Sequence, residues 1–149
     1  MLTRRRDKNH DLEHWTIRFG DIDVGHISLR AGVPRAAPQW GWACGFYPGT
    51  EPGQHRYGAA ATFDDARAAF AQAWQRLAAT RTEADYRAWR DSRDRTAWKY
   101  RMHDLHLPLP TQRPDGVARC FCGEVITSAT MDNHVLGAHR GDVRWRSRP

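Results

Sequence analysis

Two cysteines and two histidines near the C-terminus have the types and the spacing of metal ligands. One residue separates Cys120 from Cys122, eleven residues separate Cys122 from His134, and four separate His134 from His139. Thiolates and imidazoles are the ligands of closed tetrahedral zinc sites, which leave no position for water. The sequence therefore predicts one structural Zn²⁺ ion per chain, bound by these four side chains.

The segment around these residues is expected to form a short hairpin followed by a helix. On a strand, Cys120 and Cys122 would point to the same face, and Gly123 permits a tight turn directly after them. His134 is expected on the helix. Five residues of ideal helix rotate the chain by about 500°. His139 can therefore reach the same ion only if the helix is distorted or ends close to it.

The segment from residue 117 to residue 140 resembles the C2H2 zinc-finger family. That family has two cysteines separated by two to four residues, a linker of about twelve, and two histidines separated by three to five. This chain departs from the pattern by its one-residue spacer and its eleven-residue linker. The resemblance implies a ββα fold with Met131 at the position of a core leucine. It also implies base contacts from Thr127, Thr130 and Asn133.

Upstream of this segment, the pattern of apolar residues predicts a sheet covered by a helix. Alternation with a period of two indicates three antiparallel strands, at about residues 14–19, 26–30 and 40–47. A stripe of apolar side chains then indicates a helix that begins after Thr62 and packs on the sheet. A second helix, rich in arginine, begins near Thr82 and ends before a proline-rich stretch.

The predicted fold class is therefore α+β: a three-stranded antiparallel sheet packed on a helix, a second basic helix, and a small C-terminal ββα zinc finger. At the level of fold, the order β-β-β-α is similar to that of the AP2-type and integrase-arm DNA-binding modules. The expected organisation is a flexible basic arm at 1–13, a β-β-β-α-α domain at 14–107, a proline-rich linker at 108–116, the finger at 117–140 and a basic tail at 141–149.

The chain is basic, with a net charge of +6, and its positive charge comes from 21 arginines and only two lysines. Guanidinium groups bind phosphates and base edges, so this charge favours an anionic partner. Codon bias in a GC-rich genome is an alternative explanation for the choice of arginine. The candidate nucleic-acid-binding residues are Arg18, Arg30, Arg87, Arg90, Thr127, Thr130, Asn133, Arg140, Arg144, Arg146 and Arg148.

Three functions are consistent with these features. The first is a small cytoplasmic protein that binds nucleic acid, DNA in preference to RNA, without being an enzyme. The second is a zinc-stabilised module that binds a protein partner, which the lack of arginine at the base-contacting positions favours. The third, a nuclease, would use His103, Asp104 and His106. No membrane partner is expected, because no apolar run approaches the ~18 residues of a membrane span.

Overall fold

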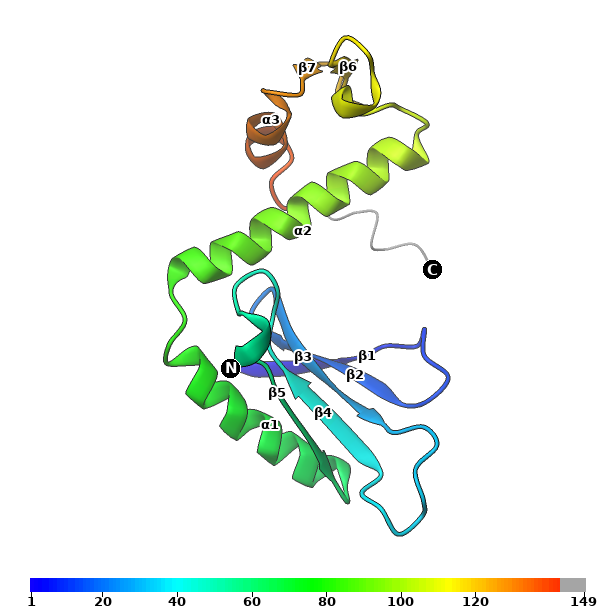
Figure 1. The fold of residues 1–149 in the computed structure, drawn as a ribbon, viewed down its shortest axis with the longest axis vertical. Coiled ribbons are helices and arrows are strands. Elements are labelled where there is room, and N and C mark those ends of the chain that lie inside the picture. Colours follow the sequence, from blue (N-terminus) through cyan, green and yellow to red (C-terminus); the bar gives the residue numbers. More distant parts are fainter. Residues whose placement is uncertain (143–149) are drawn as a thin grey trace. The chain divides into compact units, whose positions relative to one another are not determined.

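The computed structural model describes residues 1–142 (Figure 1). Within them lie a five-stranded antiparallel sheet, a separate two-stranded sheet and three α-helices. The predicted α+β class is confirmed, and the predicted three-stranded sheet is wrong. Contacts between residues divide the chain into two units, Met1–Trp89 and Arg90–Pro149, and helix α2 (Glu83–Asp104) crosses this division. No helix in the described part is both long and apolar enough to cross a membrane.

The sheet of the first unit is a meander in which each strand pairs with its neighbours in the chain. The second, third and fourth strands correspond to the three that the sequence predicts, and the first and fifth are additional. The strands are β1 (Leu2–Arg6), β2 (His14–Phe19), β3 (Ile22–Leu29), β4 (Trp40–Cys44) and β5 (Arg56–Ala60).

Strand β1 forms although its sequence, Leu-Thr-Arg-Arg-Arg, is almost entirely polar. Leu2 packs against the core of the unit. The guanidinium carbon of Arg4 lies 4.8 Å from the ring centroids of both Trp15 and Phe63. Cation–π attraction of this kind contributes about 0.5–1 kcal/mol at an exposed site. These contacts support β1 as a strand of the sheet. The sequence instead predicts a flexible arm over this stretch.

The sequence does not predict strand β5, because Arg-Tyr-Gly-Ala-Ala has little of the β-branched and aromatic character of strands. The indole of Trp42 on β4 lies over Gly58, and a Cβ at Gly58 would be 2.5 Å from its Nε1. Only glycine leaves room for that ring. A short 3-10 helix (Pro52–Gln54) lies between β4 and β5.

A β-bulge keeps the apolar side chains of β3 on one face. Ile22 and Val24 are buried, and so is Ile27, three residues later. The register against β2 shifts within this stretch. Gly25 adopts φ +148°, and a Cβ there would collide with the carbonyl oxygen of Ala43. β3 therefore extends over both Val24 and Ile27, because this bulge restores the alternation of faces.

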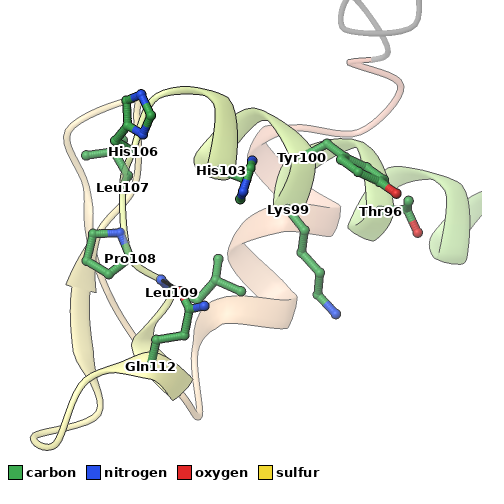
Figure 2. A pocket seen from close by; sticks show the side chains of 9 residues that line it. All are labelled: Thr96, Lys99, Tyr100, His103, His106, Leu107, Pro108, Leu109 and Gln112. Carbon is green, nitrogen blue, oxygen red and sulfur yellow. Dashed lines mark hydrogen bonds between the residues drawn. The ribbon is translucent and has the colours of Figure 1, made fainter.

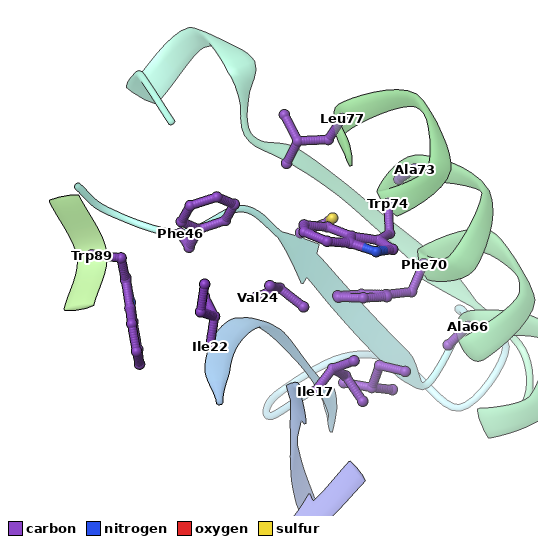
Figure 3. Close-up of a cluster of buried hydrophobic side chains, with 12 residues drawn as sticks. Ile17, Ile22, Val24, Phe46, Ala66, Phe70, Ala73, Trp74, Leu77 and Trp89 are labelled. Carbon is purple, nitrogen blue, oxygen red and sulfur yellow. The ribbon is translucent and has the colours of Figure 1, made fainter. Parts of the chain in front are cut away.

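Helix α1 (Phe63–Ala78) covers one face of the sheet (Figures 1 and 3). It begins where the sequence predicts, with the Thr62 hydroxyl accepting a hydrogen bond from the Asp65 amide at 3.1 Å. Cys44 lies in the same core, and burial raises the pKa of its thiol to about 11. The predicted apolar stripe is confirmed by the buried residues of α1, which are Ala66, Phe70, Ala73, Trp74 and Leu77.

The second unit combines the C-terminal part of α2 with a hairpin and a short helix. The hairpin consists of β6 (Val117–Arg119) and β7 (Val125–Thr127), and helix α3 (Met131–Ala138) follows. These elements share a small apolar core, whose buried residues are Trp98, Met102, Cys120, Ile126 and Val135.

The proline-rich segment that precedes β6 packs into this second unit. Leu107 and Leu109 lie against the small core, Pro110 is buried, and Pro110–Gln112 forms a 3-10 turn. The division between the units therefore lies inside α2, whereas the sequence placed a linker at 108–116. The helix ends before the prolines, as the sequence predicts, but the leucines beside them are apolar enough to be buried.

Replacing Trp74 with alanine should lower the free energy of unfolding by about 3–5 kcal/mol, the usual cost of deleting a large buried aromatic. The Trp74 side chain is 5% exposed, and its ring lies 5.2 Å from Phe19 and 6.1 Å from Phe46. Urea denaturation measures the change. The exposed neighbour supplies a control, since Gln75→Ala should change the free energy by less than about 0.5 kcal/mol. A loss near zero for Trp74→Ala would contradict the packing of α1 on the sheet.

Candidate metal centre

The four predicted metal ligands converge on one point. Nε2 of His139 lies 3.4 Å from Sγ of Cys120 and 3.2 Å from Nε2 of His134. The His134 nitrogen in turn lies 3.6 Å from Sγ of Cys122. All four ligand atoms are within 4.8 Å of one another. The group could therefore hold one metal ion.

Three separations among these four atoms match those between the corners of a tetrahedron around a single ion. With metal–sulfur bonds of about 2.3 Å and metal–nitrogen bonds of about 2.05 Å, tetrahedral angles place S and N about 3.5 Å apart and two N atoms about 3.3 Å apart. The three separations given above agree with these values to about 0.2 Å. The side chains thus have the arrangement of bound ligands with little adjustment needed.

A tight turn brings the two sulfurs to the same side of the hairpin. The Gly123 amide donates to the Cys120 carbonyl at 2.8 Å, and the Cys120 amide donates to the Glu124 carbonyl at 2.9 Å. Gly123 has φ +97°, a conformation that glycine adopts without strain. The predicted need for a permissive residue after the cysteines is confirmed.

The end of α3 brings the second histidine back toward the first. His134 lies within α3, which ends at Ala138, and His139 is the C-cap with φ −120° and ψ 23°. The His139 amide still donates to the Val135 carbonyl at 3.0 Å, so the helix ends at the second histidine itself. The predicted helix end is confirmed, although Gly137 itself remains helical.

Two residues that orient the ligands are not identified by the sequence. Oε2 of Glu124 lies 2.9 Å from Nδ1 of His134, whose side chain is only 6% exposed. A carboxylate on Nδ1 fixes the tautomer that leaves Nε2 free for a metal. The indole N–H of Trp98 donates to Sγ of Cys120 at 3.3 Å, and a hydrogen bond to sulfur favours the thiolate. Glu124 is adjacent to the cysteines in the chain, but Trp98 precedes Cys120 by 22 residues and has no local signal.

Burial shifts the pKa of two of the four candidate ligands, Cys120 and His139. It raises the pKa of the Cys120 thiol above its ordinary value, against smaller opposing effects of hydrogen bonds from the Cys122 backbone and Trp98. Burial and the nearby His134 lower the pKa of His139. The lowered pKa favours the neutral His139 imidazole, which can bind a metal directly, whereas the Cys120 thiol must lose its proton to solvent as the ion binds.

The hairpin and helix that present the ligands follow one another in the order that the C2H2 resemblance implies. No family model, curated protein or solved structure matches the chain. The assignment of a candidate metal centre therefore rests on the geometry of four side chains and on their chemistry.

The residues predicted to contact bases differ in their accessibility. The Thr130 hydroxyl accepts a hydrogen bond from the Thr127 amide at 2.9 Å, and the Thr127 hydroxyl accepts one from the Thr130 amide at 3.2 Å. These reciprocal bonds close the turn before α3 and engage both hydroxyls. Asn133 is exposed on α3 and offers the more accessible polar group.

Charged residues near the metal centre form ion pairs within the second unit. Asp132, in the first turn of α3, accepts two hydrogen bonds from the Arg95 guanidinium, one of them at 2.9 Å. Arg140, predicted to bind nucleic acid, contacts Asp91 at 2.5 Å and the buried Asp94 at 3.1 Å. Asp94 also pairs with Arg93 at 2.9 Å, so two guanidinium groups satisfy a buried carboxylate that would be strongly destabilising without partners. Arg140 therefore has a structural role in this unit.

The other predicted basic residues are spread over both units. Arg18 on β2 pairs with Asp23 at 2.9 Å, and Arg30, directly after β3, is exposed. Arg87 is exposed in the first unit, and Arg90 is the first residue of the second. Three predicted residues lie outside the described part of the chain: Arg144, Arg146 and Arg148.

The candidate nuclease residues do not converge. Nδ1 of His103 lies 3.9 Å from the Asp104 carboxylate, and the His103 side chain is 87% exposed. His106 is exposed and has φ +56°. Within residues 1–142, these three side chains do not form a group that could hold a metal. The geometry gives no support to a nuclease.

His103 and His106 lie instead at a cavity of about 700 Å³ in the second unit (Figure 2). Leu107, Pro108 and Leu109 form an apolar part of its lining, and Tyr100 lies on the α2 side. The cavity is therefore lined by both apolar and polar side chains.

Replacing Cys122 with serine should remove one metal equivalent per chain, because a hydroxyl is a poor substitute for a thiolate ligand. Elemental analysis of protein purified without chelator measures this loss, and cobalt substitution adds a thiolate charge-transfer absorption specific to the centre. Cys44→Ala is the matched control, since it removes the third cysteine and should leave the metal bound. Unchanged metal content in Cys122→Ser would contradict the centre.

Replacing Glu124 with alanine should weaken metal binding about 10- to 100-fold, the usual effect of losing a carboxylate that orients a ligating histidine. Competition with a chromophoric chelator measures the affinity. Asp104→Ala removes another carboxylate of the second unit, distant from the ligands in the chain, and should leave the affinity unchanged. Equal affinities for the two variants would show that Glu124 does not orient His134.

Proposed function

We propose that this protein binds duplex DNA and that one structural Zn²⁺ ion stabilises its second unit. The observation on which DNA binding rests is the basic sheet face of the first unit, opposite α1. The zinc proposal rests on the tetrahedral arrangement of two cysteines and two histidines. The two proposals have separate tests.

Zinc is the ion that this ligand set favours. Two thiolates and two imidazoles form closed tetrahedral zinc sites, in which the absence of an open position excludes bound water. Apparent binding free energies of about 10–16 kcal/mol are typical of structural zinc in finger peptides. We therefore infer a structural rather than a catalytic ion.

The sheet face opposite α1 is polar and basic. Among the described strand residues of this face, Asp23 is the one acidic residue. Its carboxylate forms an ion pair with Arg18 at 2.9 Å, which neutralises its charge. The exposed Arg5 and Arg30 therefore give the face a positive charge. From β1 to β3, the face presents Thr3, Arg5, His14, Thr16, Arg18, Asp23, His26 and Ser28.

Small residues flatten the neighbouring part of this face. Gly41 and Ala43 of β4 and Ala59 of β5 occupy the outward positions in the register. The Arg30 side chain extends over Gly41, where a Cβ would lie 3.2 Å from its Cγ. Tyr57, which is 69% exposed, borders the same area. A flat surface edged by a guanidinium and a phenol favours contact with a sugar–phosphate backbone.

Duplex DNA is the nucleic acid that a strand surface of this kind favours. The major groove of B-DNA is about 12 Å wide and admits a two-stranded β-ribbon, whereas the major groove of A-form RNA is deep and narrow. Arginine and threonine on a ribbon can reach both phosphates and base edges. We therefore expect tighter binding to duplex DNA than to duplex RNA.

The C-terminal sequence adds positive charge to the chain. Residues 143–149 contain three arginines and no acidic residue, which is half of the net charge of +6. Each arginine that contacts a phosphate releases counterions and strengthens binding at low salt. These residues are therefore proposed as a second source of phosphate contacts.

Binding of a protein partner is the second candidate function. The cavity of about 700 Å³ in the second unit has leucine and proline on its wall. Tyr100, also at the cavity, is 53% exposed. Concave sites of this size with apolar walls and a few polar groups are typical of ligand-binding pockets. This feature favours a partner that inserts a side chain into the second unit.

Two sets of arginines should change the salt dependence of DNA binding. Replacing both Arg5 and Arg30 with alanine should reduce the log–log salt slope by up to about 1.8, because each phosphate contact contributes about 0.9. Deleting residues 143–149 removes three arginines and should reduce the slope by up to about 2.7. Fluorescence anisotropy with a random duplex at several salt concentrations measures the slope.

The control for these variants is Arg67→Ala, because Arg67 is exposed on α1 rather than on the proposed DNA-binding face. Its slope should equal that of the unmodified chain. A dissociation constant weaker than ~10⁻⁴ M for every duplex, single strand and RNA at physiological salt lies at or below ordinary non-specific binding. That result would favour the protein-binding function. Metal analysis of the same samples separates a loss of DNA binding from a loss of zinc.

A further inference from the structure

A second group of potential metal ligands lies in the first unit, where the β1–β2 hairpin turns. A carboxylate oxygen of Asp7 and one ring nitrogen each of His10 and His14 lie within 4.8 Å of one another. The hairpin itself brings them together, because the Asp7 amide donates to the His14 carbonyl at 2.9 Å. The Asn9 amide donates to the Asp7 carboxylate at 3.0 Å and holds it at the turn.

The polar atoms of this group are incompletely satisfied. Nδ1 of His14 is buried and has no hydrogen-bond partner within the described chain. Leaving such an atom unpaired costs about 1–3 kcal/mol, and coordination of an ion through this nitrogen would offset that cost. Nε2 of His10 lies 3.3 Å from the Asp7 carboxylate. His10 is exposed, so its ring can turn toward an ion.

To bind one ion, the three ligand atoms of this group must move closer together, and one imidazole ring must change its orientation. Three atoms at the corners of an equilateral triangle with 4.8 Å sides lie about 2.8 Å from its centre, against about 2.0–2.2 Å for zinc-type bonds to nitrogen and oxygen. The His10 ring stacks on His14 with centroids 3.9 Å apart and an interplanar angle of 11°. Coordination therefore requires the exposed His10 ring to tilt out of this stack. His26 lies on the other part of the stack, 5.0 Å from His14, and supports its ring.

We propose that Asp7, His10 and His14 bind a second divalent ion of the first transition row, such as Zn²⁺, Ni²⁺ or Cu²⁺, independently of the cysteine-containing centre. Imidazole is a preferred ligand of these ions, and a carboxylate completes a set of two histidines and one acid that occurs in metal sites with open positions. Three protein ligands leave at least one position for water or for a further ligand. This centre is therefore open, unlike the closed Cys2His2 centre.

Metal stoichiometry tests the proposal on the full chain. After equilibrium dialysis against Zn²⁺ and elemental analysis, the unmodified chain should hold two equivalents, and His10→Ala and Asp7→Asn should each hold one. Two controls should retain both equivalents: Asp11→Asn, which alters an acidic residue of the same loop, and His103→Ala, which removes an exposed histidine of the second unit. Because His10 is exposed, His10→Ala should fold normally. Asp7→Asn tests the same centre through a different ligand.

Cobalt substitution separates the two centres, because thiolate-to-cobalt absorption arises at Cys120 and Cys122 and not at Asp7. This absorption should be the same in His10→Ala as in the unmodified chain, while the bound cobalt falls from two equivalents to one. A stoichiometry of one in the unmodified chain would overturn the proposal. Two equivalents retained by both His10→Ala and Asp7→Asn would overturn it as well.

Discussion

One residue of the small core of the second unit is also a candidate metal ligand, which couples the packing of this unit to the proposed metal centre. Cys120 is buried with Trp98, Met102, Ile126 and Val135. A unit of about 60 residues buries only a modest fraction of its surface and is marginally stable by apolar burial alone. Trp98 joins the two sources of stability, because its ring packs in the core while its N–H donates to the ligand sulfur. An ion at the centre would therefore stabilise α2, the hairpin and α3 together.

Arginine has two different uses in this chain. Arg95 and Arg140 form ion pairs inside the second unit, where Asp94 is buried and needs a cationic partner. Arg5 and Arg30 lie on the outer face of the sheet and have exposed side chains. Counting arginines in the sequence therefore overestimates the charge available to a partner, since part of it is already neutralised in the folded chain.

The features that sequence predicted correctly are those determined by local spacing. The convergence of the two cysteines with the two histidines and the apolar stripe of α1 follow from residue types at fixed intervals. Strands β1 and β5 and the bulge in β3 depend on contacts across the sheet: Arg4 stacks on Trp15, and Gly58 makes room for Trp42. Neither contact has a signature within its own segment. The hydrogen bond from Trp98 to Cys120 could not be predicted from the sequence either, because it joins residues that are distant in the chain.

The burial of Cys44 has a consequence for the redox chemistry of the chain. A thiol with a pKa of about 11 contains almost no thiolate near neutral pH, and the thiolate is the reactive form. The sulfurs of Cys120 and Cys122 would be occupied by a bound ion. A metal-loaded chain would then present no reactive thiol to oxidants or alkylating reagents. Departure of the ion would leave two neighbouring free thiols, of which Cys122 is exposed and Cys120 is buried. Oxidation of these thiols would prevent the ion from returning until they were reduced.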